Sequence, residues 1–429
     1  MKICVQGLWH LGVVTSAALT SLDFEVIALD YDESTIKNLK SNVLPVEEPG
    51  VRDLLTKANS NGLIEFTDSP ANIGGCEIFW LAYDTPIDDS DRADVNYVFS
   101  QFEKSLPFIN NEAIVIISSQ LPVGSARKLK NIANSVRVEN NFKFCVQPEN
   151  LRLGKALESF LMTESIILGT ESGKVEDSLE NFYSKLEIPM IWMGLESAEM
   201  TKHAINSFLA SSITLTGEIS EICELVGANS RDVEKGLRSD PRIGKKIYVS
   251  PGLGFAGGTL ARDVKFLEEL QKNRNGIISS IIQSNEYNNN WMERKFKAKF
   301  GKKKNLKILF LGLTYTEGTS TLRRSSMLDF ATSLLAKGHV INYFEDQEIS
   351  LPENVIEKFV KWNSALSKIN EIDLVVVSKK MAWQGQSEIV EQLFLSKATI
   401  FDPSGFIFDY EKKHDQYSSY LTVGIINEK

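Results

Sequence analysis

Hydrophobic positions alternate between two patterns from the start of the chain to about residue 195. Short, almost continuously hydrophobic segments are separated by stretches in which hydrophobic residues recur every three or four positions. Continuous hydrophobicity is typical of parallel strands that helices cover on both faces. The alternation therefore predicts an α/β domain with a doubly wound sheet. Its six predicted strands are KICVQG (2–7), EVIALD (25–30), EIFWLAY (77–83), AIVIISS (113–119), FKFCVQP (142–148) and SIILGT (165–170).

The pattern changes near Leu195, where a helical period continues to about Val226, with no Gly or Pro before Gly217. A helix of about 30 residues is about 45 Å long, which is more than one small domain covers. The sequence therefore predicts a helix that links domains or forms a subunit interface.

The alternation resumes near Phe300, after the short polar linker FGKKKN (300–305). The predicted fold is α/β, with two Rossmann-like doubly wound parallel-sheet domains joined by a central long-helix domain. The expected boundaries are 1–194, 195–299 and 300–429. The strands expected in the last domain are LKILFLGL (306–313), VINYFED (340–346), IDLVVVS (372–378) and ATIFDP (398–403).

Composition and charge restrict the class of protein. The chain has 429 residues, of which 43% are hydrophobic and 24% charged, as in an ordinary globular protein of two or three domains. Lys and Arg total 47 against 56 Asp and Glu, a net charge of −9. An acidic chain without a long basic segment is not expected to bind nucleic acid or an anionic membrane. The run Lys302–Lys304 is expected to be an exposed linker.

Cysteine usage and the hydrophobic runs favour a cytoplasmic protein. Cys4, Cys76, Cys145 and Cys223 have no CxxC spacing, so we expect no metal site. Most of them lie in hydrophobic stretches, as buried reduced thiols do. The opening MKICVQG enters a strand at once, unlike a signal peptide. The hydrophobic runs fall short of the roughly 18 residues that a membrane span needs.

A glycine-rich loop follows the first predicted strand. Gly7-Leu8-Trp9-His10-Leu11-Gly12 is followed, 18 residues after Gly12, by Asp30 at the end of the second strand. This spacing nearly reproduces the dinucleotide fingerprint, in which a helix N-terminus receives the pyrophosphate and the acid binds a ribose hydroxyl. An acid here favours NAD over NADP. Trp9 replaces the middle glycine. The loop is therefore either a modified NAD site or a site that no longer binds the cofactor because the Trp9 indole fills its place.

Eight further segments occur in a recognisable order: LPVEEPGV (44–51), YDTP (83–86), SSQLPVGS (118–125), VQPENLRLGKA (146–156), AEMTKHAINSFLA (198–210), DPRIG (240–244), PGLGFAGGTLARDV (251–264) and RRSS (323–326). With them the chain resembles the UDP-glucose/GDP-mannose dehydrogenase family over nearly its whole length. The resemblance implies an N-terminal NAD domain, a central helical domain that forms a homodimer, and a C-terminal domain that binds the nucleotide sugar. Such enzymes oxidise the sugar C6 alcohol to a carboxylate with two NAD, and a cysteine thiolate captures the aldehyde between the two steps.

The resemblance also implies roles for individual residues. Lys202 and Asn206 lie four apart on one predicted helix face and are expected to hold an anionic or alkoxide oxygen. Taken alone, the pair would be better explained as an exposed lysine and an interface asparagine. Glu149 is expected to position a water or the sugar, and Asp263 to orient the water or act as a base. The catalytic set is completed by Thr259, at the position of the family's cysteine.

Two further sets follow from the same motifs. The expected cofactor-binding residues are Gly7, Leu8, Trp9, His10, Leu11, Gly12, Asp30, Thr85, Gln120, Arg262 and Arg323. The expected substrate-binding residues are Glu149, Leu151, Arg152, Lys202, Asn206, Arg242, Gly252, Gly254, Phe255 and Gly257. Arg242 is expected to reach substrate across the dimer. Gly252, Gly254, Gly257 and Gly258 are expected to allow close backbone approach and positive φ in a loop that closes on the nucleotide sugar.

The departures from the family gather on the same chemistry. A threonine hydroxyl at Thr259 is far less acidic than a thiol and would not form the covalent adduct. Cys145 is expected to point into the core and not to replace the missing thiol. Gln120 occupies a position where the family has a threonine, Leu153 one where it has an acid, and Thr316 one where it has a lysine. The segment Asp402-Pro403-Ser404-Gly405 lacks the basic residue that the family has after the aspartate.

Two functions remain open on this basis. The first is an NAD-dependent 6-dehydrogenase-type oxidoreductase that acts on a UDP-sugar-like nucleotide sugar in surface polysaccharide biosynthesis. Without the thiol it is expected to carry out a two-electron or redox-neutral reaction. The second is a non-catalytic nucleotide-sugar-binding regulatory homologue.

Overall fold

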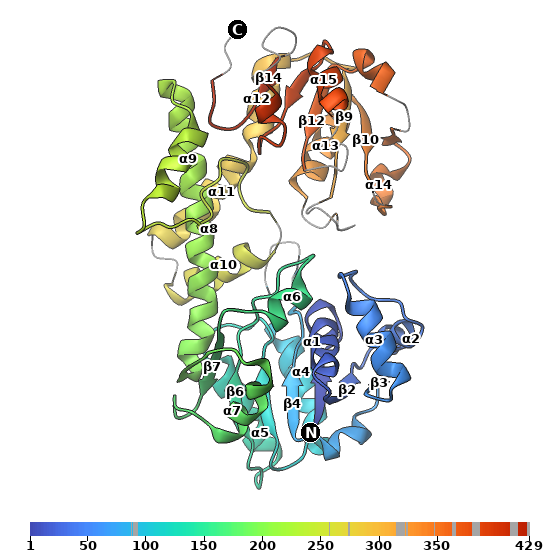
Figure 1. Ribbon diagram of the computed structural model, residues 1–429, viewed down its shortest axis with the longest axis vertical. Helices are drawn as coiled ribbons and strands as arrows, with labels where there is room; N and C mark the ends of the chain where they lie inside the picture. Colours follow the sequence, from blue (N-terminus) through green and yellow to red (C-terminus); the bar gives the residue numbers. More distant parts are fainter. Residues whose placement is uncertain are drawn as a thin grey trace. The chain divides into compact units, whose positions relative to one another are not determined.

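The computed structural model describes residues 1–426 apart from 87, 89–92, 257, 273–274, 315–321, 323–324, 347, 363–365, 380–386 and 412–418. Its internal contacts divide the chain into two compact units, Met1–Ile205 and Asn206–Lys429, whose elements are labelled in Figure 1. The predicted division into three domains stays a prediction. Within the described part of the chain, no helix is both long and hydrophobic enough to cross a bilayer.

The first unit contains an eight-stranded sheet in the order β3-β2-β1-β4-β5-β6-β7-β8. Its strands are β1 Lys2–Gln6, β2 Glu25–Leu29, β3 Ile64–Thr67, β4 Ile78–Leu81, β5 Ile114–Ile117, β6 Lys143–Val146, β7 Ile166–Thr170 and β8 Met190–Gly194. The six predicted strands are confirmed, and β3 and β8 were missed. β6 and β7 pair antiparallel, so a wholly parallel sheet is wrong at this step. The connection between them stays at the edge where β6 ends, so β7 begins at that edge.

Helices cover both faces of this sheet. They are α1 His10–Ser21, α2 Glu33–Lys40, α3 Val51–Ser60, α4 Val95–Ser105, α5 Ser125–Val136, α6 Ala156–Leu161 and α7 Asp177–Tyr183. Successive strand residues point to opposite faces, so the side chains of Ile3 and Val5 pack with α1 and α3, and that of Cys4 packs with α4 and α5. The strand order changes direction between β1 and β4, which is where doubly wound sheets bind ligands.

Helix α8, Leu195–Val226, confirms the predicted long helix and continues from the first unit into the second. In the second unit it is followed by α9 Ser230–Ser239, α10 Thr259–Leu270, α11 Ile277–Asn289 and α12 Trp291–Phe300. Gly217 allows α11 to approach α8, because a Cβ there would lie 2.2 Å from Asn288 Nδ2. That amide donates to the Thr214 carbonyl at 3.1 Å.

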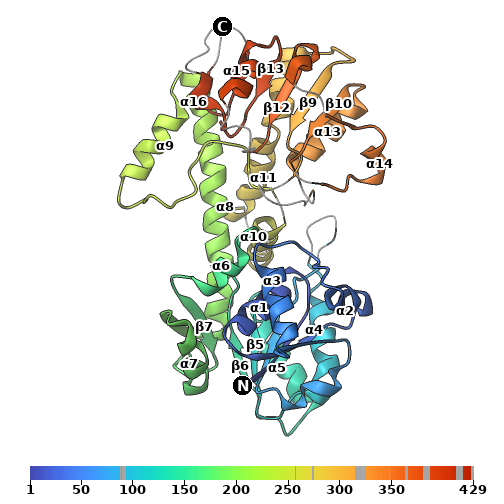
Figure 2. The same ribbon diagram turned by 45° about the vertical axis from the view of Figure 1, so that its right-hand side comes forward.

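The second unit also contains a six-stranded parallel sheet in the order β11-β10-β9-β12-β13-β14. The strands are β9 Lys307–Leu311, β10 Val340–Phe344, β11 Val360–Lys361, β12 Leu374–Val377, β13 Thr399–Phe401 and β14 Tyr420–Leu421. The four predicted strands are confirmed, whereas the two-residue strands β11 and β14 were missed. Hydrophobic residues of α13 (Ser326–Ala336) and α15 (Ser387–Leu395) pack against opposite faces (Figure 2).

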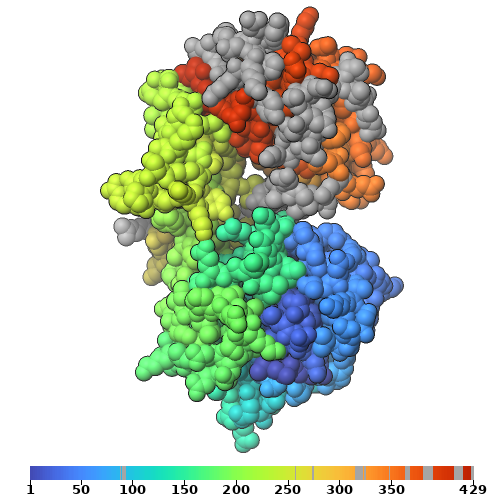
Figure 3. All heavy atoms as spheres, in the orientation of Figure 1, coloured from blue at the N-terminus to red at the C-terminus, as the bar shows by residue number. Residues whose placement is uncertain are grey.

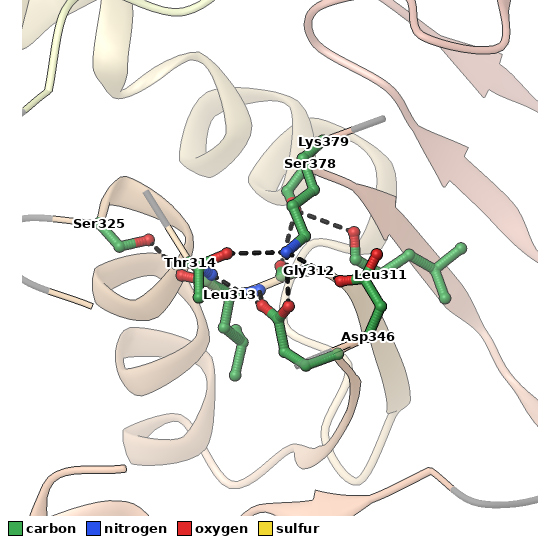
Figure 4. A network of polar contacts seen from close by, with 9 residues as sticks. Leu311, Gly312, Leu313, Thr314, Ser325, Asp346, Ser378 and Lys379 are labelled. Atoms are coloured by element: carbon green, nitrogen blue, oxygen red, sulfur yellow. Dashed lines mark hydrogen bonds and ion pairs between the residues drawn. The ribbon is translucent and has the colours of Figure 1, made fainter. Parts of the chain in front are cut away.

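A buried ion pair fills the point where the second sheet changes direction, between β9 and β12 (Figure 4). Lys379 Nζ lies 2.6 Å from Glu345 Oε2 and donates to Thr314 Oγ1 at 2.8 Å. Glu345 also accepts the backbone N–H groups of Leu313 and Thr314, the latter at 2.8 Å. Lys379 therefore fixes the loop that follows β9 to the ends of β10 and β12.

Replacing Lys379 with methionine should lower the free energy of unfolding by about 3–5 kcal/mol, because Glu345 is left as a buried charge without its cation. Lys307→Met is the matched control, since Lys307 forms an exposed pair with Glu371 at 3.0 Å in the same sheet. The control should cost less than about 1 kcal/mol. Urea unfolding of the full chain measures both values, and equal losses would contradict a structural role for the buried pair.

Candidate cofactor and active site

The glycine loop after β1 has the close approach that a dinucleotide loop requires. Gly7 has φ of +95°, and a Cβ on Gly12 would lie 1.7 Å from the Gly7 carbonyl oxygen. Only glycine at position 12 therefore lets α1 begin this close to β1. Leu8 and Leu11 of the same loop are buried.

Asp30 lies at the end of β2, where a ribose-binding acid is expected. Its side chain accepts the N–H groups of Leu8 at 2.7 Å and Asp32 at 3.0 Å. Burial raises the pKa of Asp30 above its ordinary value, although these two hydrogen bonds oppose the rise. The glycines and Asp30 thus fit the adenosine side of an NAD molecule.

Trp9 and Asp84 both lie at the start of α1, the place where a dinucleotide-binding domain receives the pyrophosphate. Trp9 is the residue that precedes α1 and is 49% exposed, so its indole is not buried in the cofactor's place. The N–H of Leu11, in the first turn of α1, donates to Asp84 Oδ2 at 2.9 Å. The sequence did not single out Asp84, because nothing local marks a contact between residues 73 positions apart.

His10 is tied to a distant loop through Glu48. Its Nε2 lies 2.8 Å from Glu48 Oε1, and Glu48 also accepts the N–H groups of Gly154 at 2.8 Å and Ala156 at 3.3 Å. Burial by itself lowers the pKa of His10, but the hydrogen bond to Glu48 and nearby carboxylates outweigh it and raise the pKa above its ordinary value. The contact with Glu48 thus favours the protonated form of His10 at the start of α1.

Glu149 is the centre of a polar cluster in the first unit. Its Oε1 accepts the Gln120 amide at 2.8 Å and lies 3.3 Å from Lys202 Nζ, and its Oε2 accepts the Leu151 N–H at 2.9 Å. Burial opposes ionisation, but the Lys202 charge and these hydrogen bonds hold the pKa of Glu149 below its ordinary value. Thr85 completes the cluster by donating to the Gln120 carbonyl at 2.6 Å. Gln120, a departure from the family, therefore joins a cofactor-loop residue to the acid.

Asn206 and Asp263 form a second polar group, in the second unit. Asn206, one helical turn beyond Lys202 on α8, donates through Nδ2 to Asp263 Oδ2, and both side chains are buried. Arg262 Nε lies 3.6 Å from Asp263 Oδ1. Arg262 is 4% exposed, and among the described residues its Nη2 has no hydrogen-bond partner. A buried guanidinium with an open donor is suited to an anionic ligand.

Thr259 is the first residue of α10 and is exposed. All four cysteines are buried, and the expectation that Cys145 points into the core is confirmed. Burial raises the pKa of Cys4 and Cys145 well above the usual value and that of Cys76 to about 11. These thiols are therefore protonated and poorly nucleophilic, and none of the three compensates for Thr259.

The other expected substrate residues lie in varied surroundings. Leu151 is half-buried and Arg152 exposed, while Phe255 packs its ring against Ala210, Val264 and Ile281. Arg242 pairs with Asp240 at 2.6 Å in an exposed segment that forms the yellow-green surface of Figure 3. Gly257, Thr316 and Arg323 lie outside the described residues.

The expected glycine roles are partly wrong. Gly252 and Gly254 have no positive φ, and Gly258 has φ of −92°. Close approach is instead the constraint at Gly254, where a Cβ would lie 2.3 Å from Asn285 Oδ1. Asn285 donates to the Phe255 carbonyl at 2.9 Å, so the loop is held by a side-chain amide and needs no left-handed turn at these positions.

The segment 402–405, which lacks the family's basic residue, lies beside a cation that the sequence did not predict. Asp402 is fully buried and accepts the N–H groups of Phe406 and Ile407 and the hydroxyl of Tyr420, so it serves the local turn. Arg231 of α9 approaches Gly405, where a Cβ would lie 1.8 Å from its Nη2. A cation from another element thus stands beside the segment that lacks one. No three His, Cys, Asp or Glu side chains of the described residues form a metal-ion cluster.

Comparison with known proteins identifies one family for both matched parts of the chain. Residues 1–187 match the UDP-glucose/GDP-mannose dehydrogenase family, NAD binding domain, and residues 196–290 match the central domain of the same family. UDP-glucose 6-dehydrogenase TuaD of Bacillus subtilis (strain 168) is 28% identical over 431 residues, covering 99% of this chain and 93% of the relative.

Solved structures agree in fold. A UDP-glucose dehydrogenase from the hyperthermophilic archaeon Pyrobaculum islandicum superposes with a TM-score of 0.86 at 23% identity, covering 99% of this chain and 98% of that one. A UDP-D-ManNAc dehydrogenase from Pyrococcus horikoshii gives 0.82 at 21% identity, covering 99% of each chain.

The family matches span well over half of the chain and include the glycine loop, Asp30 and both polar groups. The chain is therefore a member of the UDP-glucose/GDP-mannose dehydrogenase family, with NAD as the cofactor of its N-terminal part.

Proposed function

We propose that the chain is an NAD-dependent oxidoreductase that oxidises a hydroxyl-bearing carbon of a nucleotide sugar and stops after two electrons. The observation that carries the proposal is the combination of an intact polar set with an exposed threonine at position 259. The names of the relatives support a UDP-sugar substrate, and the role in surface polysaccharide synthesis stays a prediction from the family resemblance. Buried free cysteines support a cytoplasmic location.

Lys202 and Asn206 have the chemistry to hold the reacting oxygen. Glu149, whose pKa is held below its ordinary value, lies 3.3 Å from Lys202 Nζ and keeps that side chain in place. The Lys202 ammonium stabilises the negative charge that develops on the hydroxyl oxygen as its proton is lost. Asn206 uses one N–H for Asp263 and has a second N–H for the substrate. NAD, when bound near Asp30 and the start of α1, supplies the hydride acceptor.

Thr259 determines where the reaction ends. Removal of the hydroxyl proton and of one hydride converts the alcohol to a carbonyl, which needs no nucleophile from the protein. A second oxidation requires a nucleophile to add to that carbonyl first, and a threonine hydroxyl is far weaker than a thiolate. The acid Asp263 remains close in sequence, but a direct oxidation through an aldehyde hydrate is expected to be slow.

The first test measures product and stoichiometry. Full-length protein is incubated with NAD and a panel of UDP-, GDP- and TDP-sugars, and NADH absorbance and product mass are followed. We expect one NADH per sugar and a carbonyl product. Thr259→Cys should give two NADH and a carboxylate, whereas Thr259→Ser, which keeps a hydroxyl, should not. A carboxylate product from the unaltered chain would refute the two-electron limit.

The same assay addresses the alternative function, a non-catalytic nucleotide-sugar-binding regulator. Asp84 at the start of α1 and Thr259 at the nucleophile position favour this alternative. Tight binding of a nucleotide sugar without any chemical change would support it and would refute the dehydrogenase.

Lys202→Met should lower kcat/KM about 10²- to 10³-fold, because the developing oxygen charge loses its cation. The Lys202 charge also helps to lower the pKa of Glu149, so that pKa should rise in the variant and the acid limb of the pH profile should move to higher pH. Lys128→Met, at an exposed position on α5, is the control. It should leave both kcat/KM and the acid limb of the pH profile unchanged. An unshifted acid limb in Lys202→Met would contradict the coupling to Glu149.

Helix α8 carries an exposed hydrophobic stripe that supports a homodimer. Phe208, Leu215 and Ile222 are spaced by seven residues, so they share one helix face, and they are 66%, 58% and 56% exposed. A stripe of this kind on a long helix marks a protein contact. We propose that the 195–299 region forms the dimer, as the resemblance implies, and that Arg242 in its exposed segment reaches the partner's substrate.

Leu215→Glu should convert the dimer to a monomer of 48.0 kDa in light scattering, because a charge would have to be buried in the contact. Val138→Glu is the control, since Val138 is 87% exposed and lies outside the 195–299 region. If Leu215→Glu still has the mass of a dimer in light scattering, the dimer contact does not lie on this face of α8.

A further inference from the structure

Asp84 occupies the place at which the pyrophosphate of a dinucleotide meets a helix. Helix α1 begins at His10, and its first N–H groups have no partners within the helix. In this kind of domain those groups and the helix dipole bind phosphate. Here the Leu11 N–H already donates to Asp84 Oδ2 at 2.9 Å. The chain therefore supplies its own anion where the cofactor's anion binds.

The topology of the sheet fixes Asp84 in this position. β1 and β4 are adjacent and parallel, so the segment after β4 lies beside the glycine loop after β1. The Ala82 N–H donates to the Gln6 carbonyl at 2.8 Å. On the other side Thr85 is buried and donates to the Gln120 carbonyl at 2.6 Å. Asp84 is thus held between two anchored residues and reaches α1 without any change in the sheet.

The surrounding charges make this carboxylate an electrostatic competitor of phosphate. The His10 imidazole lies at the start of α1, and Glu48 already engages its Nε2 at 2.8 Å. The charges of Asp84, Glu48 and Glu149 all act on His10. A pyrophosphate at the start of α1 would therefore meet a carboxylate on the N–H that it needs and an imidazole that is already paired with Glu48.

We propose that Asp84 sets the affinity for NAD by competing with the pyrophosphate for the N-terminus of α1. The carboxylate has to leave the Leu11 N–H before the cofactor phosphates can use it, and a like charge remains close by. This inference rests on the NAD site of the proposed dehydrogenase and does not depend on which sugar is oxidised.

The experiment is calorimetric titration of the full-length protein with NAD, without any sugar. Asp84→Asn, which removes the charge, and Asp84→Ala, which also removes the acceptor, should both lower the Kd for NAD, the alanine variant by roughly tenfold. Without NAD, both variants should have a lower Tm, because α1 loses a charged capping partner. A lower Kd for NAD together with a lower Tm is a combination that a merely structural carboxylate would not give.

Two controls locate the effect. Asp94 caps α4 by accepting the Tyr97 N–H at 3.0 Å, so Asp94→Asn should lower the Tm and leave the Kd for NAD unchanged. ADP-ribose, which contains the pyrophosphate, should gain affinity in the Asp84 variants as NAD does, whereas adenosine should not.

The outcomes separate the two levels of the proposal. An unchanged or higher Kd for NAD in the Asp84 variants overturns the role of Asp84 and leaves the dehydrogenase intact. An equal gain for adenosine also overturns it, since the effect would not lie at the phosphates. Absence of NAD binding in the unaltered chain and in both variants overturns the role of Asp84 and the proposed oxidation together.

Discussion

The structure depends on how backbone N–H groups are satisfied at the carboxyl edges of its two sheets. Parallel strands with helical crossovers bring loops and helix N-termini to one edge, and each buried N–H there needs an acceptor. This chain uses carboxylates for much of that work. Asp30 serves the glycine loop, Asp84 serves α1, and Glu48 serves Gly154 and Ala156. Each such contact joins segments far apart in the sequence, so the same bonds that close the fold also shape the site.

In both sheets a carboxylate accepts the N–H that follows the first glycine, but the two carboxylates have different partners. In the first, Gly7 is followed by Leu8, whose N–H is accepted by Asp30 at the end of β2. In the second, Gly312 is followed by Leu313, whose N–H is accepted by Glu345 at the end of β10. Glu345 is also neutralised by Lys379, whereas no cation contacts Asp30 in any of its described hydrogen bonds. The carboxylate of Glu345 is therefore occupied by a buried cation, whereas that of Asp30 is held by backbone N–H groups alone in its described hydrogen bonds.

The sequence predicted those parts of the fold that local patterns determine. Ten strands and helix α8 follow from hydrophobic runs and a 3.6-residue period, which act within a single segment. Strands such as β11 and β14 have only two residues and leave no pattern to recognise. The contacts of Asp84 and Lys379 were missed for another reason: a capping partner is chosen by which strand ends are neighbours. Motif resemblance found Glu149 and Lys202, but it could not show that Gln120 joins Glu149 to Thr85.

The same reasoning explains why the departures from the family do not dismantle the site. Gln120 still provides a donor to Glu149, and Arg262 keeps a cation next to Asp263. Under the proposed function, these groups support the side chains that hold the reacting oxygen and its charge, which is what the first hydride removal demands of the protein. Capture of the resulting carbonyl is a separate demand, and it falls on a single nucleophile. Under the proposed function, a chain that retains the first set and has Thr259 in place of the nucleophile separates two halves of a reaction that the family's chemistry joins.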